Sequence, residues 1–231
     1  MNYNEYYFIE YTIPILGILI TAIAQIFINI SYKKNSVIKT NSQKTGYETA
    51  RKILDSNGLQ NIKINQVSGK LTDHYDPRNK SINLSREVYE GTSISSVSVA
   101  AHECGHAIQD KNNYFFLKFR ASLVPFVNFS SKFGYIVVIL GLIFNIIGLS
   151  KFGIGLLSLI LLFQLVTLPV EINASKRAEA QLLELDIIDK QEQKKSKRVL
   201  TAAALTYVAS LMTTFLQLLR LVLIVLGRDD D

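Results

Sequence analysis

Two of the three histidines in this 231-residue sequence stand four residues apart, in the segment His102-Glu103-Cys104-Gly105-His106. Residues four apart lie on one face of an α-helix, so both imidazoles could bind the same zinc ion. Glu103 could then act as a general base by taking a proton from a water molecule that the zinc activates. The alternative is a surface helix with coincidental histidines, which the small neighbours Ala100 and Ala101 disfavour.

The surroundings of this motif exclude two classes of zinc protease. Metzincins have Gly and His after the second ligand, where this sequence has Gln109 and Asn112. Site-2-type intramembrane proteases carry the motif inside a spanning helix, whereas polar residues flank it here. The sequence also lacks the Asp-Gly pair that would supply their usual third ligand. We therefore expect the site at or above a membrane surface.

A catalytic zinc ion usually has three protein ligands and one open position, so a third ligand must come from elsewhere. Glu171 is the leading candidate, because we expect it to open a helix that emerges from an apolar stretch on the same side of the membrane. His74 competes with it, but lies in a Pro-containing turn, which is a less rigid platform than a helix. A carboxylate at a helix start also favours the helix dipole, so a structural role for Glu171 stays open.

Five further residues have candidate roles around this site. His74 could donate to a developing oxyanion instead of binding metal, or lie in a surface turn. Tyr75, Tyr114 and Arg177 are possible oxyanion stabilisers, each with a structural role as the alternative. Cys104 fits a small helix-packing residue, and as the single cysteine it excludes an intrachain disulfide.

Four long uncharged stretches are the largest elements of the chain: residues 11–32, 133–150, 152–170 and 199–219. About 20 helical residues cross a hydrocarbon core about 30 Å thick, so each stretch predicts a transmembrane helix. Hydrophobic residues make up 48% of the chain. The composition predicts a multi-pass membrane protein and excludes collagenous, disordered and disulfide-rich classes.

The distribution of charge predicts the orientation of these helices. Residues 33–132 contain 15 Lys/Arg against 8 Asp/Glu, and residues 171–198 contain 7 against 6. The positive-inside rule places both segments in the cytoplasm and both termini outside, in the plasma membrane. The net charge of +6 is then a topology signal, and we expect no nucleic-acid partner.

The chain accordingly divides into five segments. They are a tail and first transmembrane helix (1–32), a cytoplasmic catalytic domain (33–132), a transmembrane hairpin (133–170), a cytoplasmic helix with the third ligand (171–198), and a last transmembrane helix with an acidic tail (199–231). The predicted fold is a mainly α membrane protein with four transmembrane helices and a small α+β, zincin-like metallopeptidase domain.

Smaller elements follow from local patterns. We expect a helix over 45–57, strands over 61–67 and 80–85 around a turn at 73–79, and a helix over 92–109 capped by Thr92 or Ser93. Strand 80–85 could be a sheet edge that pairs with a peptide substrate. Residues 112–132 predict an interfacial or loosely helical link, and residues 148–153 a tight hairpin turn.

Three motifs together resemble the YugP-type neutral zinc metallopeptidases, bacterial membrane proteins related in motif to the HtpX-like proteases. They are His102–His106 followed by Ala107-Ile108-Gln109, His74-Tyr75-Asp76-Pro77-Arg78, and Leu168-Pro169-Val170-Glu171 with Ala174-Ser175. The resemblance implies peptidase activity, one zinc ion per chain and Glu171 as third ligand. Ser175 and Asn173 stand where related patterns have Asp, so the usual carboxylate support of a ligand histidine is replaced here.

The sequence therefore predicts a membrane-anchored, gluzincin-like zinc endopeptidase that acts on peptide or protein substrates, with the lipid bilayer as its other partner. An inactive membrane scaffold or adaptor that retains the fold is the alternative, although a scaffold needs no general base such as Glu103. A nucleic-acid-binding membrane protein rests on basic charge alone, and salt-dependent DNA retention would reveal it. No pattern indicates an oligomeric state.

The orientation can be tested with single cysteines in a Cys104→Ser background. A cysteine at Asn79 should be protected from an impermeant thiol reagent in intact cells and react after permeabilisation, because the positive-inside rule places it in the cytoplasm. A cysteine at Lys151, in the predicted external hairpin, is the control and should react in intact cells. Labelling of the Asn79 position in intact cells would refute this topology.

Overall fold

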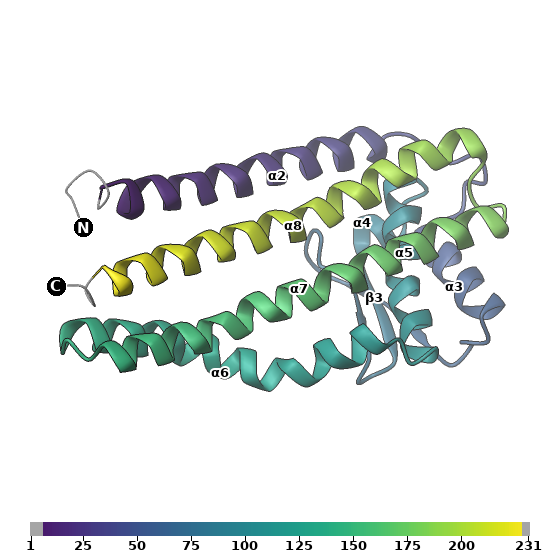
Figure 1. The fold of residues 1–231 in the computed structure, drawn as a ribbon. Helices are drawn as coiled ribbons and strands as arrows, with labels where there is room; N and C mark the ends of the chain where they lie inside the picture. Colours follow the sequence, from purple (N-terminus) through teal and green to yellow (C-terminus); the bar gives the residue numbers. More distant parts are fainter. Residues whose placement is uncertain (1–6, 228–231) are drawn as a thin grey trace. The chain divides into compact units, whose positions relative to one another are not determined.

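The structure, a computed structural model, describes residues 7–227, without the side chain of Phe8 (Figure 1). Most of the predicted acidic C-terminal tail and residues 1–6 of the predicted N-terminal tail lie outside the described residues. The chain forms two compact units. The first contains Met1–Gln25, Phe119–Leu168 and Thr206–Asp231, and the second contains Ile26–Lys118 and Pro169–Leu205.

Four long helices dominate the chain, and each contributes residues to both units. They are α2 (Ile13–Ser36), which follows the π-helical turn η1 (Phe8–Thr12), α6 (Phe115–Ile143), α7 (Ile147–Glu184) and α8 (Lys190–Leu226). All four are long and apolar enough to cross a membrane, which agrees with the number of transmembrane helices predicted from the sequence.

The second of these helices begins earlier than predicted. Residues 115–132 form the first part of a continuous α6, with Pro125 inside it, rather than an interfacial or loosely helical link. The basic residues near its start do not prevent helix formation, because Lys and Arg are good helix formers. Arg120 lies over the Phe163 ring, 5.6 Å from its centroid. A search for uncharged stretches therefore places the start of this helix too late in the sequence.

The turn between α6 and α7 also lies earlier than predicted, at residues 144–146 instead of 148–153. Asn145 takes a left-handed conformation, with φ of 56°, and the Ile146 N–H donates to the Gly141 carbonyl at 2.8 Å. One glycine from the predicted turn, Gly153, serves helix packing instead. A Cβ added to Gly153 would lie 2.7 Å from the Val138 backbone nitrogen, so only glycine permits this close crossing.

Within the first unit, α2 and α8 are joined by polar contacts. The hydroxyls of Thr21 and Thr213 lie 3.0 Å apart, and Thr213 also donates to the Gly17 carbonyl. Near the other end of the pair, Arg220 donates to Glu10 at 2.5 Å. Polar groups in apolar segments are stable when they satisfy one another in this way.

The second unit contains the remaining helices, and α3 and α5 agree with the sequence prediction. Helix α3 (Gly46–Ser56) starts with a capping box between Thr45 and Glu48, and helix α5 (Ile94–Lys111) is capped by the Ser93 hydroxyl. A short helix, α4 (Arg86–Tyr89), connects the sheet to α5. The caps satisfy backbone N–H groups at the first turn of α3 and α5 and so define where these helices begin.

Three short strands form a mixed sheet with the order β1-β3-β2. Strand β1 (Lys63–Val67) is parallel to β3 (Ser81–Ser85), and β2 (His74–Asp76) is antiparallel to β3. The prediction of a turn at 73–79 was wrong for its first part, because Tyr75 pairs with Ile82 and its hydroxyl anchors to Asp110 at 2.7 Å. The predicted sheet edge at 80–85 was also wrong, since β3 is the buried central strand.

One hydrophobic core holds the second unit together. The sheet, α3, α5, the last part of α7 and the turn after it supply fully buried side chains, among them Ile53, Leu54, Ile82, Leu84, Val97, Ala101, Cys104, Leu182 and Ile187. Burial raises the pKa of the Cys104 thiol well above its usual value, in keeping with a packing role. The face of α7 formed by Ala174, Ala178 and Leu182 is buried.

Helices α5 and α7 approach each other most closely at Gly105. A Cβ at this position would lie 2.5 Å from the Ala174 carbonyl oxygen and 3.1 Å from the Ala174 Cα. Both atoms belong to the backbone of α7, which cannot move aside as a side chain could. Glycine at this position therefore sets the distance between the two helices.

Gly105→Ala should force α5 away from α7 and destabilise the protein by about 1–3 kcal/mol, as overpacked cores usually do. The thermal unfolding midpoint of the purified protein in detergent should fall. Gly155→Ala is the matched control, because no atom lies within 4 Å of a Cβ added there. Alanine is the better helix former, so the control should keep or raise the midpoint. Equal midpoints for Gly105→Ala and the wild type would contradict the proposed tight packing.

Candidate metal site

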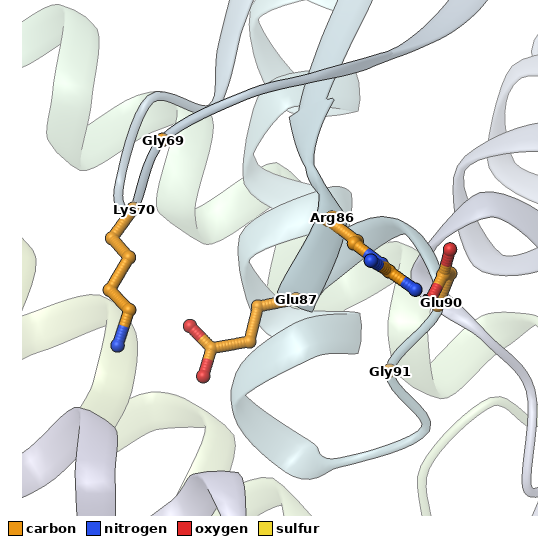
Figure 2. Close-up of a pocket in the computed structure, with 6 residues that line it drawn as sticks. All are labelled: Gly69, Lys70, Arg86, Glu87, Glu90 and Gly91. Atoms are coloured by element: carbon orange, nitrogen blue, oxygen red, sulfur yellow. Dashed lines mark hydrogen bonds and ion pairs between the residues drawn. The ribbon is translucent and has the colours of Figure 1, made fainter.

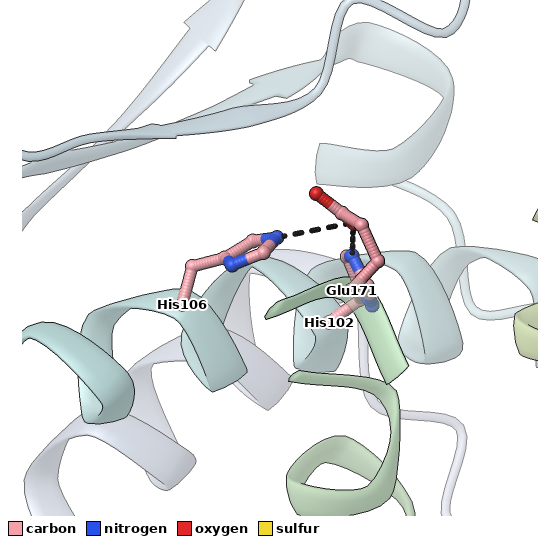
Figure 3. A group of neighbouring side chains, drawn as sticks. All are labelled: His102, His106 and Glu171. Atoms are coloured by element: carbon pink, nitrogen blue, oxygen red, sulfur yellow. Dashed lines mark hydrogen bonds and ion pairs between the residues drawn. The ribbon is translucent and has the colours of Figure 1, made fainter. Parts of the chain in front are cut away.

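Three side chains converge between α5 and α7 (Figure 3). His102 Nε2 lies 3.2 Å and His106 Nε2 3.5 Å from the same oxygen, Glu171 Oε2. The two imidazole rings stand nearly perpendicular, with centroids 4.8 Å apart. Because each residue offers one ligand atom and these atoms all lie within 4.8 Å of one another, the group could hold a metal ion.

Glu171 reaches this position from inside a helix. The sequence analysis expected it at the start of the cytoplasmic helix that emerges from the third apolar stretch, and α7 runs without a break from Ile147 to Glu184, through Pro169. A helix can continue past a proline at the cost of one backbone hydrogen bond. Glu171 is therefore far from the first turn of α7, and the helix dipole does not explain a carboxylate there.

The three side chains are shielded from solvent. The exposed fractions are 15% for His102, 12% for His106 and 4% for Glu171. Burial alone would lower the pKa of His106, but hydrogen bonding to Glu171 and the negative charges of Glu103 and Glu171 outweigh it and raise that pKa. The site thus favours a positive charge next to the carboxylate, which a metal cation also supplies.

Each histidine has a hydrogen-bond partner at its other ring nitrogen. The Ser175 hydroxyl lies 3.2 Å from His102 Nδ1, and Gln109 Oε1 lies 3.0 Å from His106 Nδ1. These neutral groups occupy the place where a carboxylate commonly orients a ligand histidine. The sequence analysis named Ser175 as a possible support, but used Gln109 only as a departure from the metzincin pattern and as part of the motif that carries the family resemblance.

Gln109 is itself held by α7. Its side chain is fully buried, and its Nε2 donates to the Val170 carbonyl at 2.8 Å and to Asn173 Oδ1 at 3.0 Å. Arg177 Nε donates to the same Asn173 oxygen at 2.8 Å. Arg177 is therefore linked to Gln109 through Asn173, and its role as an oxyanion stabiliser stays a prediction. Gln109 follows His106 by three positions on one helix, and residues with this spacing are neighbours, so the sequence could have indicated their contact.

Glu103 lies on α5 next to His102 and is nearly buried, with 7% of its surface exposed. Its negative charge is among the causes that raise the pKa of His106. Its place agrees with the predicted role beside the two histidines, although that role remains a prediction.

His74 lies apart from the cluster, on strand β2. Its Nδ1 is 2.8 Å from the Thr72 carbonyl, so this nitrogen carries the proton, and its Nε2 lies 3.2 Å from Asn83 Nδ2. The side chain is exposed. These contacts are those of a histidine that orders a strand and its turn.

The two predicted tyrosines have other partners in the structure. Burial and then the hydrogen bond to Asp110 raise the pKa of Tyr75, so its hydroxyl stays protonated and is engaged by that carboxylate. Asp110 also binds Lys80. The Tyr114 ring contacts Phe116, with the centroids 5.8 Å apart.

A cavity of about 510 Å³ lies elsewhere in the second unit (Figure 2). It is lined by Lys70, Arg86, Glu87 and Glu90, together with Gly69 and Gly91. Arg86 and Glu90 form an exposed ion pair at 3.2 Å. None of the residues that sequence analysis named as site candidates lines this cavity, so it is separate from the histidine cluster.

Comparison with known proteins agrees with the site. The family described as "Putative neutral zinc metallopeptidase" matches residues 10–226. The chain is 43% identical over 225 residues to the "Putative membrane protease YugP" of Bacillus subtilis (strain 168), an alignment that covers 97% of this chain and 99% of the relative. No solved structure matches. The extent of both matches shows that the chain belongs to the neutral zinc metallopeptidase family.

Proposed function

We propose that this protein is a membrane-anchored zinc endopeptidase in which His102, His106 and Glu171 bind the metal. The convergence of two imidazole nitrogens on one buried carboxylate oxygen is the observation that carries the proposal. Two histidines and a glutamate form a ligand set of gluzincin type, with a position left open for substrate or water. The domain around them is then zincin-like in its chemistry.

The spacing of the donor atoms supports a zinc ion as the ligand. Zn–N and Zn–O bonds of about 2.1 Å at tetrahedral angles separate two ligand atoms by about 3.4 Å. The separations in the structure are 3.2 Å and 3.5 Å. All three ligand atoms lie within 4.8 Å of one another, a spacing that supports a small divalent cation bound between the two helices.

Zinc, when bound, supplies a Lewis acid that polarises the peptide carbonyl and makes water a stronger acid. Glu103 acts beside it as the general base that accepts a proton from the attacking water. The oxygen bonds to the carbonyl carbon, and the C–N bond breaks as Glu103 passes the proton to the leaving amine. Its near burial keeps this carboxylate away from bulk water.

The chain's four apolar helices and its membrane-protease relative support a place in the plasma membrane. The excess of Lys and Arg in residues 33–132 supports an active site on the cytoplasmic side. Peptide or protein segments that reach this surface are the substrates. A scaffold that retained the fold would need neither the buried Glu103 nor a free position on a metal.

The ligand set is tested by comparing two single variants. Glu171→Ala should lose most of the bound zinc, since it removes one of three ligands. His74→Ala should retain the zinc, because His74 lies on β2 with partners of its own. Metal content of the purified protein, measured by atomic emission, distinguishes them. Loss of zinc from His74→Ala, with retention in Glu171→Ala, would reverse the assignment.

The general base is tested by Glu103→Gln, which keeps the size of the side chain but removes its basicity. Peptide hydrolysis should fall at least about 100-fold, the usual contribution of general-base catalysis, with about one zinc per chain retained. Proteomic comparison of cells that express the wild type and the variant would identify the substrates. A variant that cleaves at the wild-type rate would refute the enzyme assignment.

A further inference from the structure

A chain of hydrogen bonds runs from α7 to the second ligand histidine on α5. Arg177 donates to Asn173 Oδ1, Gln109 donates to the same oxygen and to the Val170 carbonyl, and Gln109 Oε1 faces His106 Nδ1. Gln109 is fully buried, so none of its polar atoms can turn to solvent. The proton of each of these hydrogen bonds can be assigned, because some of the groups can only donate and others can only accept.

The assignment starts from two groups, a guanidinium that can only donate a hydrogen bond and a backbone carbonyl that can only accept one. A guanidinium only donates, so the atom of Asn173 that Arg177 contacts must be the carboxamide oxygen. A backbone carbonyl only accepts, so the atom of Gln109 that faces Val170 must be its NH₂ group. The orientation of both carboxamides is therefore determined by their partners.

The oxygen of Gln109 is then the atom that faces His106. A carboxamide oxygen can only accept a hydrogen bond, so His106 Nδ1 must carry the proton of this contact, which is 3.0 Å long. In a neutral imidazole with a proton on Nδ1, the lone pair lies on Nε2. His106 Nε2 is the nitrogen that points at Glu171 Oε2, 3.5 Å away (Figure 3).

The hydrogen-bond partner of His102 does not select one tautomer of its imidazole. Its Nδ1 lies 3.2 Å from the Ser175 hydroxyl, which can either donate or accept. The two histidines therefore differ: the surroundings of His106 select one tautomer, whereas Ser175 is compatible with both tautomers of His102.

We propose that Gln109 is a positioning residue that fixes His106 as the Nδ1–H tautomer and so presents its Nε2 lone pair to zinc. The inference rests on the proposed metal site and assigns to a neutral carboxamide the task that a carboxylate commonly has. The buried amide is held in one orientation by the Val170 carbonyl and Asn173, with Arg177 securing Asn173 from behind.

The first measurement uses Gln109→Met, which keeps an unbranched side chain but removes the acceptor for His106 Nδ1. Zinc affinity of the purified full-length protein, measured by competition with a chromophoric chelator, should fall about 10–100-fold, as for other lost partners of ligand histidines. Gln181→Met is the matched control, since Gln181 binds Asn57 and Glu184 away from the site and should leave zinc affinity unchanged. Unchanged affinity in Gln109→Met would overturn the inference.

The second measurement reads the tautomer directly and does not depend on any variant. Nitrogen-15 spectra of histidine-labelled, zinc-loaded wild type should show His106 with its proton on Nδ1 and none on Nε2, with the signal assigned through the backbone resonances of the neighbouring residues. A predominant Nε2–H form would overturn the inference even if Gln109→Met fails to fold. Zinc-loaded wild type that shows no peptide hydrolysis would overturn the proposed function alone, because the tautomer and the chelator competition do not require activity.

Discussion

A carboxylate buried between two imidazoles is the interaction on which the rest of this structure depends. A charged group that is almost completely shielded from water is costly unless a cation or hydrogen bonds compensate it. Glu171 finds this compensation only if α5 and α7 stay close enough for both His102 and His106 to reach it. Gly105 makes that distance possible, because any side chain at this position would meet the backbone of α7.

Helix α7 contains both an apolar segment and the glutamate of the candidate metal site. Its first part is apolar enough to span a bilayer, and the same unbroken helix carries Glu171 and, behind the cluster, Asn173, Ser175 and Arg177. Ala178 and Leu182, further along, pack into the core of the second unit. A helix pinned by this core holds a ligand more rigidly than a loop could, which is what a metal site requires.

The hydrogen bonds behind the histidines show how neutral groups can replace charged ones. A carboxylate behind a ligand histidine adds negative charge to a region that already contains Glu103 and Glu171. Ser175 and Gln109 orient the two rings without that charge, and Arg177 contributes a positive charge one contact further away. Like charges therefore do not accumulate around the single carboxylate that faces both imidazoles.

The sequence by itself determined the local features: the spacing of His102 and His106, the helix near residues 45–57, a cap at Thr92 or Ser93, and four apolar stretches long enough to span a membrane. These depend on residues close together in the chain, whose side chains or backbone groups meet whenever a helix forms. Only the tertiary structure decided that β2 pairs with the buried β3, that α6 begins at Phe115, and that Gln109 supports His106. Each of these outcomes requires a partner distant in the sequence, such as Ile82 for Tyr75, Phe163 for Arg120 or Val170 for Gln109, and local patterns do not identify such partners.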